Sequence, residues 1–124
     1  MNTEKIKELL AEITSLLDEE KPVVIDKYIS LVVKPRDEPE PMTWFEAMEK
    51  FGPDGTDKEW RLPTQIELAV LWENKEALSG PITGGWYWSS TENSSASARN
   101  QRFSDGLQTF SNKYNTNLVR CVRR

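Results

Sequence analysis

Two helix-start signals of the same kind, at Thr43 and Thr64, limit what this chain can fold into. Each threonine is followed three residues later by a glutamate, which is the capping-box pattern that begins a helix. Apolar residues follow both signals, and they predict one helix over 44–51 and another over 65–72. Both helices therefore lie in the first two thirds of the chain.

Strand signals lie on both sides of these helices. Residues 22–34 are rich in valine and isoleucine and predict one or two strands, whereas three prolines make 35–41 an extended connection. After a loop over 79–85, residues 86–91 begin a series of short strands. The series ends at 118–123, where the alternation predicts a half-buried strand. The order predicts an α+β fold, with helices packed on a small twisted antiparallel sheet.

An amphipathic helix is predicted ahead of this domain, over residues 1–21, and Pro22 ends it. Four of its apolar residues also match the a and d positions of two short heptads. They are Ile6, Leu9, Ile13 and Leu16. Two alternatives stay open: the helix packs on its own domain, or it joins copies of the chain in a homo-oligomer. The expected division is a helix over 1–21 and a binding domain over 22–124.

The chain is short of two residue types on which many enzymes and metal sites depend. It contains no histidine, and Cys121 is its single cysteine. The absence of histidine removes the commonest general base and the commonest transition-metal ligand. One cysteine excludes an intramolecular disulfide and a multi-cysteine metal cage. We therefore expect no enzyme activity and no cofactor, and we expect Cys121 to be a small buried residue in the core.

Charge is distributed unevenly along the chain. Residues 1–92 carry a net charge of −9, whereas residues 93–124 carry +5. No nucleic-acid-binding motif accompanies the basic end, so we do not expect nucleic acid as a partner. The sequence shows no secretory signal and no apolar stretch long enough for a membrane span. The chain is expected to be cytoplasmic or virion-associated unless another route exports it.

Three sequence blocks occur together in an order that resembles a known bacterial domain family. The blocks are Thr43-Trp44, then Trp60-Arg61-Leu62-Pro63-Thr64 with Glu67-Leu68, then Tyr87-Trp88-Ser89-Ser90-Thr91 with Val119-Arg120-Cys121-Val122-Arg123. They resemble the family typified by the C-terminal domain of collagen-like adhesins. That family is related to the formylglycine-generating-enzyme branch of C-type-lectin-like folds. The resemblance covers about residues 31–124 and implies a C-type-lectin-like fold.

The chain departs from the calcium-binding and catalytic members of such folds. A Glu-Pro-Asn or Gln-Pro-Asp loop with a Trp-Asn-Asp strand would make the chain resemble the calcium-dependent sugar-binding members of such folds. Neither motif occurs here. The sequence Glu38-Pro39-Glu40-Pro41 lies far upstream of the expected loop and lacks the amide. Resemblance to the oxidase branch of the fold would require a site built on paired cysteines. Cys121 alone cannot supply such a pair. We expect a binding domain that needs no calcium ion and holds no other metal.

Large side chains in these blocks are expected to build the core, because short irregular strands supply little aliphatic area. The expected core residues are Trp60, Leu62, Trp86 and Trp88. Arg61 and Arg120 are expected to form ion pairs beneath the loops. Their candidate partners are Glu67 and Glu92.

The segment 93–118 is expected to face the ligand, because its composition is that of an adaptable binding surface. Among and just after these residues, the positions that look fixed are Phe103, Gly106, Lys113, Val119 and Arg120. The positions that look interchangeable are Ser94, Ser95, Ser97, Arg99, Arg102, Ser104, Asp105, Leu107, Thr109, Phe110, Ser111 and Tyr114. Antibody paratopes use a similar mixture of small polar residues and rigid aromatic contacts.

The same segment is similar to the variable region of proteins diversified by a retroelement that mutates adenines. That process rewrites Asn codons at their first two bases and cannot produce Lys, Glu, Gln, Met or Trp. Residues 93–120 hold three such residues, against 31 in residues 1–92. The resemblance implies a hypervariable surface for an unknown protein or glycan ligand. An invariant exposed β segment would show the same bias. The alternative is therefore a structural or adhesin subunit of a virion or surface fibre that oligomerises through the N-terminal helix.

Overall fold

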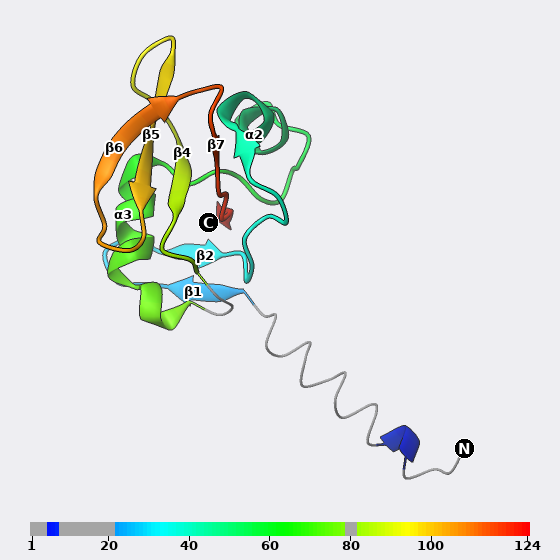
Figure 1. Cartoon of the computed structure of the whole chain (residues 1–124). Coiled ribbons are helices and arrows are strands. Elements are labelled where there is room, and N and C mark those ends of the chain that lie inside the picture. The colour runs from blue at the N-terminus through cyan, green and yellow to red at the C-terminus, as the bar shows by residue number, and fades with distance from the viewer. Residues whose placement is uncertain (1–4, 8–21, 79–81) are drawn as a thin grey trace.

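The computed structural model describes residues 5–7, 22–78 and 82–124 (Figure 1). Within the described part of residues 22–124, three short strands are followed by two short α-helices and then by five more short strands, so the predicted α+β class is confirmed. Residues 5–7 are helical and Ile6 is exposed, whereas Leu9, Ile13 and Leu16 lie outside the described residues. No helix in the described ranges has the length and apolar character to cross a membrane.

Both helices begin where the capping boxes predict. Strand β3 (Met42–Thr43) leads into α2 (Trp44–Phe51), and the Thr43 side chain accepts a hydrogen bond from the backbone N–H of Glu46. In the same way Thr64 caps α3 (Gln65–Glu73), and a 3₁₀ turn, η1 (Lys75–Ala77), follows it. In each box the glutamate side chain also accepts from the backbone N–H of the threonine, so each box satisfies two backbone donors that have no partner within the helix.

Three short strands form one end of the domain. They are β1 (Val23–Ile25), β2 (Leu31–Val33) and the C-terminal β8 (Val122–Arg123), hydrogen-bonded antiparallel in the order β1-β2-β8. Val33 pairs with Val23 on one side and with Val122 on the other, which ties the two ends of the domain together. The strands predicted within 22–34 are therefore confirmed.

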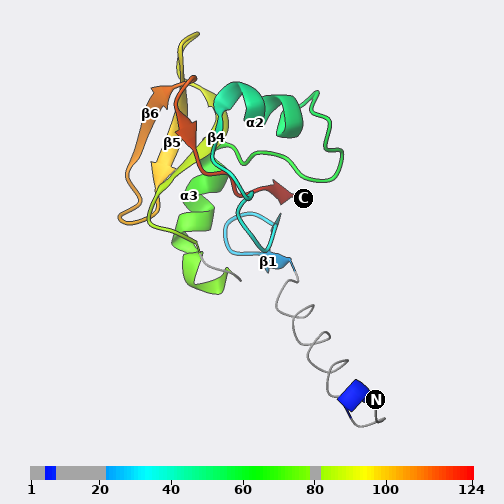
Figure 2. The same cartoon turned by 45° about the vertical axis from the view of Figure 1, so that its right-hand side comes forward.

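A second three-stranded sheet carries most of the C-terminal third. It contains β4 (Trp86–Glu92), β5 (Ser97–Arg102) and β6 (Gln108–Asn112), antiparallel and in sequence order. Helix α3 packs on one face of this sheet, and α2 lies toward the other (Figures 1 and 2). Beyond it, β7 (Thr116–Asn117) pairs with β3. β6 is thus an edge strand, with the hairpin it forms on the outside of the molecule.

The C-terminal segment 118–123 runs between two hydrophobic clusters. Val122 belongs to the cluster under α3 and the β1-β2-β8 sheet, whereas Val119 and Cys121 belong to the cluster under α2. The prediction of a half-buried strand is therefore wrong. The side chains do alternate in direction, but both directions lead into a core, and residues 119–122 are all buried. Cys121 is a buried core residue, as expected.

The predicted core is right for Trp88 and Leu62, right in part for Trp60, which packs against the edge of the cluster under α2, and wrong for Trp86. Trp88 and Leu62 are buried, but Trp60 and Trp86 are only partly covered. An arginine lies over each of the half-buried rings: Arg123 is 4.5 Å from the Trp60 centroid and Arg102 is 5.1 Å from that of Trp86. Each of these rings thus lies near the surface, beneath an arginine side chain.

One predicted ion pair is replaced by two others. Arg120 does not pair with Glu67 or Glu92, because its guanidinium donates to Asp37, with 2.7 Å between Nε and Oδ1. Glu92 pairs with Lys113 at 3.0 Å. The extended connection 35–41 passes beside the C-terminal segment and supplies the partner that the sequence spacing does not indicate.

Candidate ligand-binding surface

The segment 93–118 forms a β-hairpin whose turn requires glycine. Gly106 has a φ of +81°, in the left-handed region that favours glycine. A Cβ at this position would lie 2.6 Å from the ring of Trp72. The backbone N–H of Gly106 donates to the carbonyl of Arg102 at 2.8 Å, which closes the turn. The assignment of Gly106 as a fixed position therefore has a steric reason.

The other positions that look fixed are buried. Phe103 packs in the cluster under α3, with its ring centroid 4.8 Å from that of Tyr87. Lys113 is also buried; its Nζ donates to Glu92 at 3.0 Å and to the carbonyl of Ser95 at 3.1 Å. The Lys113 ammonium lies 4.4 Å from the Trp44 ring centroid. These contacts fix the base of the hairpin against α2.

The apolar side chains among the interchangeable positions are exposed. Leu107 is 49%, Phe110 54% and Tyr114 78% exposed, which confirms that they are available to a partner. Most of the polar positions are exposed or half-buried, namely Ser94, Ser95, Arg99, Arg102, Ser104, Asp105, Thr109 and Ser111. Whether these side chains contact a ligand stays a prediction.

Ser97 is the exception, because it is buried. Its hydroxyl lies 2.8 Å from the Ser94 Oγ and accepts from the Asn93 side-chain amide at 2.9 Å. Its backbone carbonyl accepts from the N–H groups of both residues, so Ser97 holds the β4–β5 turn together. The expectation that Ser97 faces the ligand is corrected: it supports the turn that displays Ser94.

The exposed positions do not lie on one face. Arg99 pairs with Phe110 and Asn100 pairs with Thr109 in the β5–β6 ladder, so Arg99 and Phe110 point to one side of the sheet and Thr109 to the other. Tyr114 lies beyond β6, next to α2. The candidate surface therefore wraps around the outer edge of the hairpin.

An exposed aromatic residue outside the segment extends this surface. Phe45, at the start of α2, is exposed, and its ring centroid lies 5.1 Å from that of Tyr114. The two rings are tilted by 54°, a geometry that suits an aromatic pair. The sequence interpretation missed Phe45. The sequence feature that could have indicated Phe45 is an apolar residue next to Trp44, on the exposed side of an otherwise amphipathic helix.

A shallow groove of about 440 Å³ lies on the α2 side of the hairpin, between β6 and β7. It is lined by Trp86, Asn100, Thr109, Phe110, Ser111, Asn115, Thr116 and Asn117. Only three of these residues, Thr109, Phe110 and Ser111, were predicted as ligand contacts. The others come from β4, β5, β7 and the residue before β7, which the sequence alone does not bring together.

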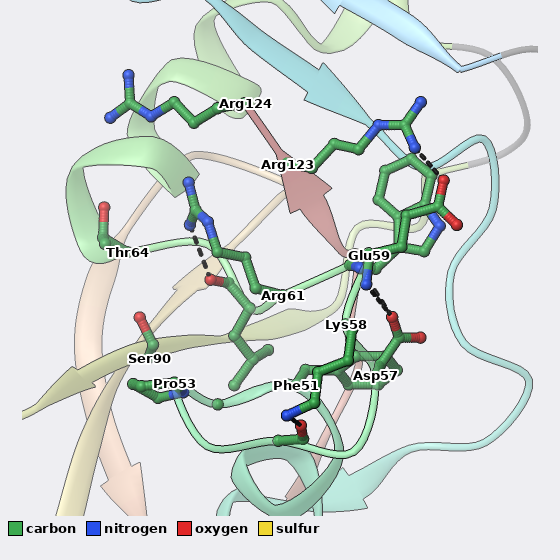
Figure 3. Close-up of a pocket in the computed structure, with 14 residues that line it drawn as sticks. Phe51, Pro53, Asp57, Lys58, Glu59, Arg61, Thr64, Ser90, Arg123 and Arg124 are labelled. Atoms are coloured by element: carbon green, nitrogen blue, oxygen red, sulfur yellow. Dashed lines mark hydrogen bonds and ion pairs between the residues drawn. The ribbon is translucent and has the colours of Figure 1, made fainter.

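A larger hollow of about 550 Å³ lies away from the hairpin, beside the loop that follows α2 (Figure 3). Several of its charged groups are held by protein partners. Arg123 forms an ion pair with Glu59, and the Lys58 ammonium donates to the carbonyl of Gly55 at 2.8 Å. The Asp57 carboxylate accepts from the backbone N–H of Trp60 at 2.8 Å. We assign this hollow to the scaffold.

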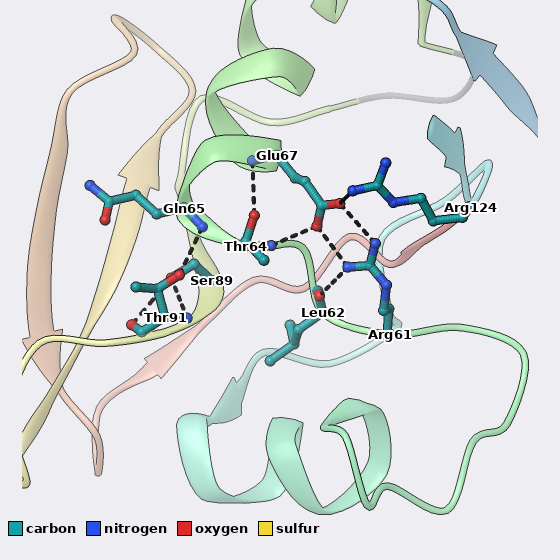
Figure 4. Close-up of polar contacts among 8 residues, drawn as sticks. All are labelled: Arg61, Leu62, Thr64, Gln65, Glu67, Ser89, Thr91 and Arg124. Atoms are coloured by element: carbon teal, nitrogen blue, oxygen red, sulfur yellow. Dashed lines mark hydrogen bonds and ion pairs between the residues drawn. The ribbon is translucent and has the colours of Figure 1, made fainter. Parts of the chain in front are cut away.

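Glu67 organises the entry into α3 (Figure 4). It is buried, and Arg61 donates two hydrogen bonds to its carboxylate, at 2.6 and 2.8 Å, which confirms this predicted pair. The backbone N–H of Thr64 donates to the same carboxylate at 2.9 Å. Burial raises the pKa of Glu67, but these hydrogen bonds outweigh it and leave the pKa below its usual value. A carboxylate held charged in this way is a structural anchor and a poor general acid.

The comparison with known proteins identifies the family. Residues 22–123 match the model of the Lcl C-terminal domain. The chain belongs to the Lcl C-terminal domain family. This agrees with the bacterial family that the three sequence blocks indicate. No curated protein matches the chain. Both three-stranded sheets, both helices and the candidate surface lie within the matched part of the Lcl C-terminal domain.

The Glu38-Pro39-Glu40-Pro41 sequence has a structural use in this Lcl C-terminal domain. The Glu38 carboxylate is buried and pairs with Lys34 at 3.0 Å and with Lys50 at 3.6 Å. Within the described residues, no three cysteine, aspartate or glutamate side chains come close enough to hold a metal ion. Independence from calcium stays a prediction.

Deleting residues 1–21 is expected to leave a folded domain, because the family match begins at residue 22 and β1 at Val23. Circular dichroism and a thermal melt measure folding, and light scattering on the full and shortened chains measures assembly. An unfolded short chain would show that the N-terminal segment completes the core. An unchanged number of copies would exclude the segment as the contact between them.

Proposed function

We propose that this chain is a non-enzymatic ligand-binding protein with a C-type-lectin-like fold, whose segment 93–118 is a hypervariable surface diversified by a retroelement. The family membership supports a lectin-like binding domain. The absence of histidine supports binding without catalysis. One observation supports the retroelement: the residue types that it cannot produce from Asn codons occur in the segment only where their side chains make contacts within the domain.

All three residues of the types that adenine rewriting cannot produce support the hairpin from within. These residues are Gln101, Gln108 and Lys113. The Gln101 side chain donates to the carbonyl of Gly106 at 3.1 Å, and that of Gln108 donates to the carbonyl of Gln65 at 2.9 Å. Gln101 and Lys113 are buried. The residues that this rewriting of Asn codons cannot have produced are therefore scaffold residues, and the exposed positions are of types that it can produce.

Sequencing this locus across related strains tests diversification. Differences should cluster at the exposed positions between Asn93 and Leu118, while Gln101, Gln108 and Lys113 stay unchanged. A near-repeat of the coding segment should lie beside a reverse transcriptase gene. Differences spread evenly along the gene, or a segment identical in all strains, would contradict the retroelement and leave an invariant adhesin-like domain.

Replacing seven surface residues together should separate stability from binding. The seven are Arg99, Arg102, Asp105, Leu107, Thr109, Phe110 and Tyr114, each changed to Ser or Asn. The melting temperature should change little, since surface substitutions usually stay within about 0.5 kcal/mol each. The ion pair between Arg102 and Asp105 is solvent-exposed and adds little. A cell-surface or glycan screen identifies a partner of the parent chain, and the seven-residue variant should no longer bind that partner. The parent chain should still bind it in the presence of a calcium chelator.

The control carries Ser at three exposed apolar residues elsewhere, Val24, Tyr28 and Ile66. It should melt and bind like the parent. A seven-residue variant that fails to fold would show the segment to be core β-structure, and one that still binds would place the ligand on another surface.

A further inference from the structure

We infer that the outer edge of β6 binds an extended, acidic segment of a partner protein as an added strand. The inference rests on the proposed binding function and names the partner class for one part of the candidate surface. A row of backbone N–H and C=O groups lies along this edge without partners in the described residues. Another strand fits such a row, because it presents the same groups at the same repeat.

The backbone bonds at the two ends of β6 show which of its groups face β5. Just before β6, the Leu107 carbonyl accepts from the Arg102 N–H at 2.9 Å. Just after β6, the Lys113 N–H donates to the Ala96 carbonyl at 2.9 Å. Both bonds continue the register of the β5–β6 ladder, in which residues that bond inward alternate with residues that face outward. The odd-numbered residues of β6 therefore bond to β5.

The even-numbered residues of β6 turn their backbone groups outward. These residues are Gln108, Phe110 and Asn112. The Asn112 carbonyl accepts from the Asn115 N–H at 3.0 Å, but the other outward N–H and C=O groups find no hydrogen-bond partner in the described part of the chain. In both views β6 is the outermost strand of its sheet (Figures 1 and 2). An exposed edge of this kind is a template for pairing with another chain.

β6 lacks the features that usually protect an edge strand from such pairing. Its sequence, Gln-Thr-Phe-Ser-Asn, contains no charged residue and no proline. Its register with β5 is continuous, whereas β4 has a register shift between Trp88 and Glu92. The opposite edge of the sheet is occupied, because the backbone groups of Trp86 and Trp88 bond to Leu118. Strand addition to this sheet is therefore open at β6.

The charges beside this edge favour an acidic partner segment over a second copy of the chain. Arg99 lies opposite Phe110 on β5 and has no ion pair with another described residue. An added strand lies two strand spacings from β5, about 10 Å, and an arginine and a glutamate side chain can bridge that gap. A second copy would bring another Arg99 and another segment 93–124 with its net charge of +5, which is unfavourable.

Strand addition also suits a surface whose side chains vary. Main-chain hydrogen bonds supply affinity whatever side chains β6 carries, while the side chains select among partner sequences. Thr109, Phe110 and Ser111 are interchangeable positions, and Phe110 is 54% exposed at the centre of the edge. Its ring can pack on an apolar side chain of the added strand. Diversification would then change the partner sequence and keep the mode of binding.

Random heptapeptides displayed on phage and selected on the full chain test the inference. At least one selected peptide, once synthesised, should bind saturably and carry Asp or Glu. Backbone amides 108, 110 and 112 should exchange with solvent quickly in the free chain, and the bound peptide should slow them at least tenfold by NMR-detected hydrogen exchange. Arg99→Gln should weaken the peptide about threefold, as for an exposed ion pair. It should not weaken an analogue of the peptide with Gln in place of Glu.

A proline at the centre of the edge separates the backbone donor from the side chain. Phe110→Pro removes an outward N–H that takes no part in the β5 ladder, and edge strands tolerate proline at such positions. Phe110→Ala truncates the same side chain and keeps the N–H, so it is the matched control. The proline variant should bind the peptide about fivefold more weakly than the alanine variant, the effect of one hydrogen bond. If Phe110→Pro does not fold, Asn112→Pro against Asn112→Ala makes the same comparison.

Four results would overturn the inference. They are a selection that yields no binding peptide, a bound peptide that leaves the three outward amides unprotected, a proline variant that binds as tightly as its alanine control, or outward amides already protected in the free chain by a dimer that sedimentation detects. If one occurs while the seven-residue variant still loses the screened partner, strand addition fails and the proposed function stands. A parent chain that binds neither a peptide nor a screened partner would reject both.

Discussion

Trp88→Ala should reduce the free energy of unfolding by about 3–5 kcal/mol, the usual effect of removing a large aromatic side chain from a core. Trp88 is fully buried and packs in the cluster under α2. Its indole N–H donates to the carbonyl of Met42 at 2.9 Å, and its backbone N–H donates to the carbonyl of Leu118 at 3.0 Å. Trp88 thus joins β4 to β3 through Met42 and to the segment after β7 through Leu118. The total free energy of unfolding of a folded domain is about 5–15 kcal/mol, so this variant should lose a large part of it.

Urea unfolding monitored by circular dichroism measures this loss. Trp88→Phe keeps an aromatic ring but removes the donor to Met42, so it should destabilise the domain by less than the alanine variant. Trp86→Ala, two residues away on the same strand, should have a much smaller effect because that ring is half-exposed. A Trp88→Ala variant that unfolds at the same urea concentration as the parent would show that this part of β4 is not core, and Trp88 would then become a candidate ligand contact.

The parts of the fold that the sequence predicts are those set by short-range contacts. The Thr43 and Thr64 capping boxes close over three residues, so their geometry is written in neighbouring positions. The exposure of Leu107 and Phe110 likewise follows from a hairpin at the outside of the sheet. Local chemistry decided each of these features, and each prediction was confirmed.

Features that depend on distant residues could not be predicted. Trp60 resembled a core residue until Arg123, 63 positions later, was placed over its ring. The groove joins Trp86 to Asn117 because the Leu118 N–H donates to the carbonyl of Trp86 at 2.9 Å, and nothing in the local sequence of either residue indicates it. Candidate contacts near the hairpin tip were visible from composition alone, whereas the groove needs the register of three strands.

Arg120→Met should destabilise the domain by about 3–5 kcal/mol, because it leaves the mostly buried carboxylate of Asp37 without its counterion. Trp88 and Arg120 are the two largest fully buried side chains among the described residues. The Arg120 Nε lies 2.7 Å from the Asp37 Oδ1, and Nη1 donates to the carbonyl of Lys34 at 3.2 Å. Tyr87 donates its hydroxyl to the other Asp37 oxygen at 2.7 Å. Burial together with this bond to a carboxylate raises the pKa of Tyr87 to about 12.

A double-mutant cycle separates this effect from the loss of packing. Asp37→Asn added to Arg120→Met removes the orphaned charge, so the double variant should be more stable than the sum of the two single losses predicts. Arg123→Met is the matched control. Its ion pair with Glu59 is partly exposed, so we expect a loss below about 1 kcal/mol. Additive losses in the cycle would mean that Arg120 acts through its buried alkyl chain, and the connection 35–41 would then be held by packing instead of by charge.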